Sequence, residues 1–304
     1  MNVIETCGLA RRYRRTWALR DCNLAIPAGH VVALVGPNGA GKTTLLNLAA
    51  GLLRPTTGHV TVLGSEHPGS EAARSRIGFV AQDAPLYGHL PAGDMLHLAR
   101  NLNANWDDDG ALARLADLGI PLDRKVRQLS GGQRAQLALT IALAKRPEVL
   151  ILDEPLASLD PLARHDFMGS LMAVVAEDGL SVVFSSHVVS ELERIADYLV
   201  VLNEGRLQLA GDVDALLSTH RVLTGPGGEM AIKSQRLSVV QAKQAAAQTH
   251  LLVRMPTADP APVGWLSAPA SLEDLVLAYL RDPKASMLPG PAMAGASGGS
   301  AVTT

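Results

Sequence analysis

The segment Gly36-Pro-Asn-Gly-Ala-Gly-Lys-Thr43 constrains the fold of this chain more than any other stretch. An apolar run, Val31 to Val35, precedes it, and the residues from Thr44 to Ala50 favour a helix. Backbone N–H groups of a glycine-rich loop can approach phosphate oxygens because glycine places no Cβ in the way. The N-terminus of the following helix adds a partial positive charge. The segment therefore predicts a phosphate-binding loop.

Two side chains of this loop suit the chemistry of a bound triphosphate. Lys42 supplies a compact cation for the outer phosphates, and the hydroxyl of Thr43 is a ligand for Mg²⁺. The alternative is a solvent loop that happens to be rich in glycine. It is weaker because both flanks have the strand and helix patterns that phosphate binding requires.

The bulk properties of the 304-residue chain exclude several kinds of site and partner. Its formal net charge is −2, so no basic excess points to nucleic acid. Cys7 and Cys22 show no disulfide-framework spacing, and none of the nine histidines joins a metal-ligand cluster. No signal peptide is expected, and no apolar run approaches the roughly 20 residues that span a bilayer. If a membrane takes part, we expect another chain to supply it.

Chemically competent residues follow the ends of several short apolar segments, which we interpret as strands alternating with helices. These residues are Gly36, Gln82, Asp153 with Glu154, and His187. In an open α/β sheet, ligands bind outside the carboxyl ends of the strands. We therefore expect these separate signals to meet around one nucleotide.

The pair Asp153-Glu154 ends the continuously apolar run Val149-Leu-Ile-Leu152. Two uncompensated carboxylates beside a buried strand are costly, and a Mg²⁺ ion would relieve that cost. On this interpretation Asp153 serves Mg²⁺ and Glu154 is the base for an attacking water. The alternative is a helix N-cap at the strand exit, with Pro155 in the first turn. Both interpretations are compatible.

Residues 86–147 predict a helical insertion between strands. Within it, Leu129-Ser-Gly-Gly-Gln133 precedes a helix that Ser130 can cap, and Gly131-Gly132 leaves the helix N-terminus open to an anion. The alternative is an ordinary capped helix with a glycine-rich entry.

Two further residues each have a structural and a functional interpretation. Tyr13, in an N-terminal strand, is either a packed side chain or a platform on which a nucleobase stacks. Asp160 precedes a predicted helix from Pro161 to Val175, so its simplest role is an N-cap.

With these residues in place, the chain resembles the nucleotide-binding subunit of an ATP-binding cassette (ABC) transporter over about residues 1–220. The matching segments, in order, are the Walker A loop, the Gln loop, the signature segment, Walker B with its glutamate, the D-loop and the switch histidine. They lie at Gly36–Thr43, Gln82, Leu129–Gln133, Asp153 with Glu154, Ser158–Asp160, and His187. The resemblance implies an α/β P-loop NTPase fold of the ABC type, in which helices flank a mixed sheet. It also implies an antiparallel β element and an inserted helical subdomain at about 86–147.

The resemblance further implies a role for each matched residue. Tyr13 would stack on adenine, Glu154 would polarise the attacking water, and His187 would contact the γ-phosphate. The ATP phosphates would be held by Gly36, Pro37, Asn38, Gly39, Ala40, Gly41, Lys42, Thr43 and Thr44, with Lys42 also catalytic. Mg²⁺ or its water shell would be served by Thr43, Gln82 and Asp153. In such subunits two chains close head to tail on two ATP molecules. The residues that complete the partner's site would be Ser130, Gly131, Gly132 and Gln133, with Asp160 between the two sites.

The implied function is ATP hydrolysis that powers transport through a separate transmembrane permease. The implied assembly is a homodimer, or a heterodimer with a related ATP-binding subunit, in the cytoplasm and peripheral on the inner face of the cell membrane. No nucleic acid is expected. Ser185–Ala196 and Ser271–Leu280 look like the subfamily that drives bacterial ABC-2-type exporters, which implies export. The alternative is a soluble ABC ATPase in translation or DNA repair, although this chain has one cassette and no sustained heptads.

The match leaves residues 221–284 as a C-terminal accessory region and residues 285–304 as a tail. Within the accessory region, strands are predicted at 221–223 and 251–254, and a helix at 238–248. The tail is rich in Pro, Gly, Ala and Ser, which predicts disorder.

Overall fold

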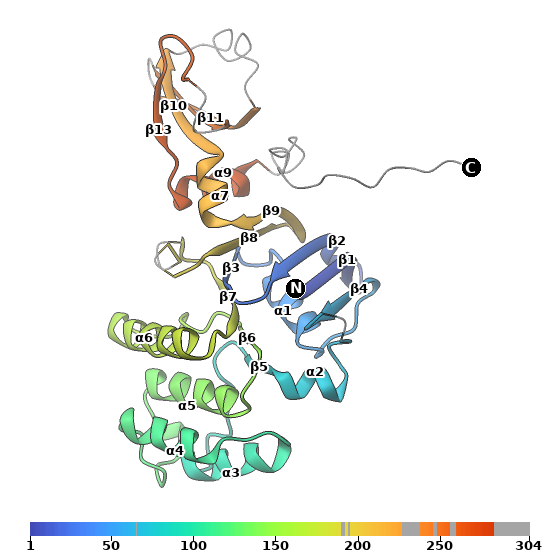
Figure 1. Ribbon diagram of the computed structural model, residues 1–304, viewed down its shortest axis with the longest axis vertical. Helices are drawn as coiled ribbons and strands as arrows, with labels where there is room; N and C mark the ends of the chain where they lie inside the picture. The colour runs from blue at the N-terminus through green and yellow to red at the C-terminus, as the bar shows by residue number, and fades with distance from the viewer. Residues whose placement is uncertain are drawn as a thin grey trace, which may run out of the picture. The chain divides into compact units, whose positions relative to one another are not determined.

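The computed structural model describes residues 1–64, 66–189, 192–193, 195–226, 238–245, 248–255 and 260–282. The chain divides into two compact units, Met1–Val213 and Asp214–Thr304, which are described separately (Figure 1). The predicted domain boundary at residue 220 stays a prediction. The tail predicted at 285–304 lies outside the described residues.

A six-stranded sheet forms the centre of the first unit, in the order β5-β6-β7-β3-β8-β9. Its strands are β3 (Val31–Val35), β5 (Ile77–Val80), β6 (Val149–Leu152), β7 (Ser181–Ser186), β8 (Tyr198–Asn203) and β9 (Arg206–Asp212). Neighbouring strands are parallel from β5 to β8, and β9 runs antiparallel to β8. β3, β6 and β7 are buried at every position, as expected for parallel strands covered on both faces. The carboxyl ends of the parallel strands therefore share one edge.

A second sheet is antiparallel, with the order β2-β1-β4. Its strands are β1 (Asn2–Tyr13), β2 (Thr16–Pro27) and β4 (Thr57–Val62). The register shifts within the β1–β2 hairpin: Arg11 lies opposite Leu19, whereas Arg12 lies opposite Trp17. Ala18 is therefore the extra residue of a β-bulge.

A helical insertion separates β5 from β6 (Figure 1). It contains α3 (Ala92–Leu102), α4 (Asp108–Asp117), the short 3-10 helix η1 (Val126–Gln128) and α5 (Gly131–Ala144). Asp107 caps α4, and Ser130 caps α5 in a reciprocal capping box with Gln133. The helices share one apolar core, which consists of Ala92, Met95, Leu96, Ala111, Leu115, Ile120, Val126, Leu129, Leu137 and Ala144. The insertion is thus a packed body with its own core.

Three further helices complete the first unit: α1 (Lys42–Ala49), α2 (Glu71–Arg76) and α6 (Pro161–Asp178). Asp160 caps α6, because its carboxylate accepts hydrogen bonds from the N–H groups of Leu162 and Ala163. The predicted fold class, a mixed sheet with flanking helices, an antiparallel element and inserted helices, is confirmed. Within the described ranges, no helix has the length and apolar character needed to cross a membrane.

The second unit is built on a four-stranded antiparallel sheet in the order β11-β12-β10-β13. Its elements are α7 (Val213–Ser218, which begins at the boundary), β10 (His220–Pro226), β11 (Ser238–Ala245), β12 (Gln248–Arg254), β13 (Leu266–Pro269) and α9 (Leu272–Arg281). The strands predicted at 221–223 and 251–254 are confirmed by β10 and β12. The helix predicted at 238–248 is wrong, because this segment pairs as β11 with β12 and buries the β-branched Val240.

A buried chain of hydrogen bonds joins the sheet of the second unit to its helices. His220 and Tyr279 are 1% and 0% exposed, and His220 Nε2 lies 3.0 Å from the Tyr279 hydroxyl oxygen. His220 Nδ1 lies 2.7 Å from the carbonyl oxygen of Leu216, so Nδ1 must carry the proton. Arg254 Nε donates to the Tyr279 oxygen at 2.6 Å, which leaves the Tyr279 proton to donate to His220 Nε2. The arrangement requires a neutral His220.

We expect the second unit to lose stability as the pH falls below the ordinary histidine pKa of about 6.5. Burial lowers the pKa of His220, so the unfolded chain takes up a proton at a pH where the folded one does not. Stability then falls with falling pH by at most about 1.4 kcal/mol per pH unit. Hydrogen exchange of β10 and β12 between pH 7.5 and 5.5 measures the effect.

The matched variant for this prediction is His220→Gln, which still accepts a hydrogen bond but does not titrate. It should flatten the pH dependence of exchange, whereas His250→Gln, on β12, should leave that dependence intact. Equal pH dependence in the parent chain and in His220→Gln would contradict the assignment.

Candidate functional site

The glycine-rich loop between β3 and α1 has a backbone that tolerates few side chains. Gly41 has φ +105°, and a Cβ there would lie 2.5 Å from the carbonyl oxygen of Ala18 in the bulge of β2. A Cβ at Gly36 would lie 2.3 Å from the carbonyl oxygen of Leu202. The same Ala18 carbonyl would be 2.8 Å from a Cβ at Gly205, in the β8–β9 turn. The loop, the antiparallel sheet and the central sheet are therefore in backbone contact.

A pocket of about 420 Å³ opens on this loop. It is lined by Ala18, Pro37, Asn38, Gly39, Ala40, Gly41, Lys42, Thr43, Thr44, Gln82, Glu154, Ala157 and His187. The structure thus brings together residues that follow β3, β5, β6 and β7, as expected from the shared edge of the sheet. Gly36 lies at the base of the loop, where its carbonyl oxygen accepts a hydrogen bond from Lys42.

Three charged or titratable side chains meet in this pocket. Lys42 Nζ lies 3.0 Å from Glu154 Oε1, and His187 Nδ1 lies 2.6 Å from Glu154 Oε2. The side chains of Lys42 and Glu154 are only 5% and 10% exposed, so solvent screens their attraction weakly. Burial alone would raise the pKa of Glu154, but hydrogen bonds from Lys42 and His187 outweigh it and lower that pKa. Glu154 is therefore held ionised beside a buried cation.

Asp153 follows β6, precedes the pocket residue Glu154 and is 2% exposed. Its Oδ1 accepts hydrogen bonds from Thr43 Oγ1 at 3.2 Å and from Ser185 Oγ at 2.8 Å. Both of these donors are neutral, and a buried carboxylate with neutral partners leaves its charge uncompensated. The hydroxyl–carboxylate pair suits a hard cation such as Mg²⁺, whose preferred ligands are oxygens.

Ser185 is a site residue that the sequence argument missed. Besides donating to Asp153, its hydroxyl accepts a hydrogen bond of 2.8 Å from the backbone N–H of Glu154. Glu154 has φ +49°, which is uncommon outside glycine, and this contact helps to hold that backbone. In the sequence, Ser185 is only a hydroxyl residue that follows the apolar run Val182-Val-Phe184. Its burial and its place on a strand beside β6 come from the structure.

The signature segment and Asp160 do not line the pocket of their own chain. Ser130 to Gln133 begin α5, and the side chains of Ser130 and Gln133 are engaged in the capping box. Asp160 is likewise the N-cap of α6. The structural interpretation of Ser130 and Asp160 as helix N-caps is therefore observed.

Tyr13 ends β1 and is 43% exposed. Strand alternation puts Tyr13, Arg11 and Leu19 on one face of the hairpin, and Trp17 on the other. The Leu19 side chain would be 3.4 Å from a Cβ at Gly41. The hairpin face that carries Leu19 and Tyr13 is therefore the one turned toward the glycine-rich loop. The Arg11 guanidinium lies 4.9 Å from the centroid of the Tyr13 ring. Of the two hairpin aromatics, Tyr13 is therefore the one on the face turned toward this loop.

Comparisons with known proteins agree on one family. The model of a family described as "ABC transporter" matches residues 19–157. The chain is 31% identical over 253 residues to an uncharacterized ABC transporter ATP-binding protein of Nostoc sp., covering 78% of this chain and 75% of that protein. It is 34% identical over 220 residues to the sulfate/thiosulfate import ATP-binding protein CysA of Escherichia coli (strain K12), covering 69% of this chain. The alignment spans only 60% of the length of that CysA.

A solved structure shows the same likeness in three dimensions. It is an ATP-binding cassette, a dimer in a post-hydrolysis state bound to ADP and Pi. Its TM-score to this chain is 0.62 at 27% identity, and the match covers 69% of this chain and 98% of that one. The likeness thus includes nearly all of that cassette.

Proposed function

The chain belongs to the family of ABC transporter ATP-binding proteins, which are ATPases, and we propose that it hydrolyses ATP to drive a separate membrane permease. The observation that carries the proposal is the pocket in which Lys42, Gln82, Glu154 and His187 converge on the glycine-rich loop. In this assignment the chain is peripheral on the inner face of the cell membrane.

The hydrolytic roles follow from the charges of the pocket. The loop amides and Lys42 bind the phosphates, and Glu154 orients and deprotonates the attacking water. His187 contacts the carboxylate of Glu154, and in this proposal it also contacts the γ-phosphate. Thr43, Asp153 and the Gln82 side chain would hold Mg²⁺ or its water shell, and the ion would neutralise phosphate charge. Tyr13 stacks on adenine.

Dimer closure on ATP is supported by the position of the signature segment. α5 begins with Gly131 and Gly132, which have no side chains to cover the backbone N–H groups at the start of the helix. Such N–H groups at a helix N-terminus suit a phosphate. Since these residues lie outside the pocket of their own chain, we assign Ser130, Gly131, Gly132 and Gln133 to the site of a second ATP-binding subunit, with Asp160 beside the interface.

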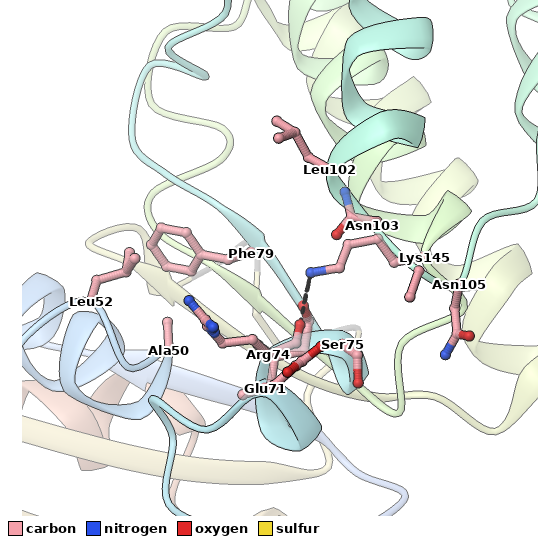
Figure 2. A pocket seen from close by; sticks show the side chains of 12 residues that line it. Ala50, Leu52, Glu71, Arg74, Ser75, Phe79, Leu102, Asn103, Asn105 and Lys145 are labelled. Atoms are coloured by element: carbon pink, nitrogen blue, oxygen red, sulfur yellow. Dashed lines mark hydrogen bonds between the residues drawn. The ribbon is translucent and has the colours of Figure 1, made fainter.

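A second pocket, of about 400 Å³, supports contact with the permease (Figure 2). Its lining residues are Ala50, Leu52, Glu71, Arg74, Ser75, Ile77, Phe79, Leu102, Asn103, Ala104, Asn105 and Lys145, and we call it the docking pocket. Leu52 and Leu102 are 60% and 75% exposed and both line this pocket, so they offer apolar surface to a partner. Its walls come from the core of the unit and from the helical insertion, so a segment bound there touches both.

Leu102→Glu should weaken co-purification of the permease by about tenfold or more, since it places a charge where an apolar contact is expected. Leu112→Glu is the matched control, because Leu112 is an exposed leucine of α4 that does not line the docking pocket. A mild-detergent pull-down with the tagged chain measures the effect, as the ratio of permease recovered with the variant to permease recovered with the unaltered chain. Equal loss in both variants would argue against a docking role.

The decisive experiment for the function as a whole is that pull-down with the unaltered chain. A polytopic membrane protein should be recovered with it, and MgATP hydrolysis should be measurable in the recovered complex. Recovery of ribosomes or DNA-repair proteins in its place would overturn the transport assignment.

We assign the direction of transport as export, on the resemblance of Ser185–Ala196 and Ser271–Leu280 to ABC-2-type subunits. The name of the CysA relative describes import, and it favours the opposite direction. Inside-out membrane vesicles separate the two outcomes. ATP should make them accumulate the transported compound if the complex exports it, and release a preloaded compound if it imports.

A further inference from the structure

Lys145 joins the two walls of the docking pocket (Figure 2). It follows α5 directly, and its Nζ donates to the carbonyl oxygens of Arg74 at 2.9 Å and Ile77 at 2.8 Å. Arg74 belongs to the last turn of α2, and Ile77 is the first residue of β5. The end of the helical insertion is therefore fastened to the junction between α2 and β5.

The ammonium group of Lys145 is held in this place at an energetic cost. Burial, followed by the nearby charge of Arg74, lowers the pKa of Lys145. The two carbonyl oxygens offset part of this cost, since carbonyls at a helix C-terminus carry partial negative charge. A lysine on a flexible four-carbon stem adopts a desolvated position only when its contacts favour it.

Each contact of Lys145 leads to a different part of the ATP site. β5 ends at Val80, and Gln82, two residues further on, lines the ATP pocket. In the other direction α5 runs for 14 residues, about 21 Å at 1.5 Å per residue, to the signature segment at its N-terminus. Ala144, next to Lys145, belongs to the core of the insertion. Movement of the insertion against the core must therefore change the surroundings of Lys145.

We propose that Lys145 is a positioning residue that couples the docking pocket to the ATP site, through β5 to Gln82 and through α5 to the signature segment. The proposal rests on the proposed function and adds to it the residue that transmits the coupling. Coupling between two sites is reciprocal, so ATP binding must also change the docking pocket. This reciprocity makes the proposal testable on the chain alone, without its permease.

A second link between the same segments provides a matched control. Arg76, at the end of α2, forms a bidentate ion pair with Glu148, just before β6. The side chains of Arg76 and Glu148 are 32% and 53% exposed, and neither residue lines the docking pocket. If any fastening of α2 to the α5–β6 segment sufficed, loss of this pair would have the same effect as loss of Lys145.

The experiment uses the full chain with an environment-sensitive fluorophore at position 105, in the docking pocket. The background carries Cys7→Ser, Asn105→Cys and Glu154→Gln, so that labelling is confined to position 105, Cys22 being buried, and ATP is not consumed. Fluorescence is recorded on addition of MgATP, and calorimetry on the same samples measures ATP binding. Circular dichroism checks the fold of each variant.

MgATP should change the fluorescence of the background chain. Lys145→Met should reduce the amplitude at least about fivefold while ATP affinity changes by less than about twofold. Lys145→Gln, also neutral, should do the same and serves if Lys145→Met does not fold. Lys145→Arg, whose two N–H groups can reach two carbonyl oxygens, should retain the response, and so should Arg76→Ala.

Three results would overturn the proposal. A full response in the neutral variants would show that Lys145 is dispensable, and an equal loss in Arg76→Ala would show general loosening of the segment. ATP binding without any response in the background chain would show that the pocket and the ATP site are not coupled. Absence of ATP binding would be a different failure, because it would overturn the proposed function itself.

Discussion

Glu154→Gln is expected to lower ATP turnover by about two to four orders of magnitude, the usual contribution of a positioned general base. The amide cannot take a proton from water, yet it has nearly the shape of the carboxylate. ATP binding should persist, because the loop residues and Lys42 that contact the phosphates are unchanged. Steady-state hydrolysis measures the first effect. Size-exclusion chromatography with MgATP should show an ATP-dependent dimer, since closure is no longer followed by hydrolysis.

The control for this prediction is Glu177→Gln, an exposed glutamate on α6 that does not line the ATP pocket. Its turnover should equal that of the parent chain. Turnover by Glu154→Gln at a comparable rate would remove Glu154 from the role of base, whatever its distance from Lys42.

Lys42→Ala is expected to weaken ATP binding by about tenfold to a hundredfold. A hydrogen bond to a charged group contributes about 1.5–3 kcal/mol, and each 1.4 kcal/mol is a factor of ten in affinity. The variant also removes the buried cation that lies 3.0 Å from Glu154. The uncompensated carboxylate then faces the phosphates, which adds repulsion to the lost attraction.

Calorimetry with ATP and Mg²⁺ measures this loss, and Lys125→Ala is the control, since Lys125 is exposed and does not line the ATP pocket. Unchanged affinity in Lys42→Ala would mean that the cation is not part of the binding site. Hydrolysis by that variant at full rate would lead to the same conclusion.

The parts of the site that the sequence predicted are those fixed by local pattern. Gly36 to Thr43 have their own loop signature, and Gln82, Asp153 and His187 could be located because each follows a recognisable strand. Their meeting required only the general rule that parallel strands end at one edge. Ser185 was missed because its role depends on β7 lying beside β6, which is a fact of strand order.

The second unit shows the limit of local pattern. Residues 238–248 were predicted as a helix, yet β11 forms there because pairing with β12 satisfies its backbone and buries Val240. The docking pocket was also beyond prediction. Its residues belong to different helices and loops that are far apart in sequence, among them Leu52, Arg74, Leu102 and Lys145. No local sequence pattern therefore predicts that they meet.

The contacts of the Ala18 carbonyl with Gly41 and Gly205 have a consequence for the choice of nucleotide. They fix the hairpin that carries Tyr13 to the loop that binds phosphate, through main-chain atoms and without adjustable side chains. The distance between Tyr13 and the glycine-rich loop is thereby set by the backbone of the fold. In the proposed function, this fixed separation would favour nucleotides whose base and phosphates match it.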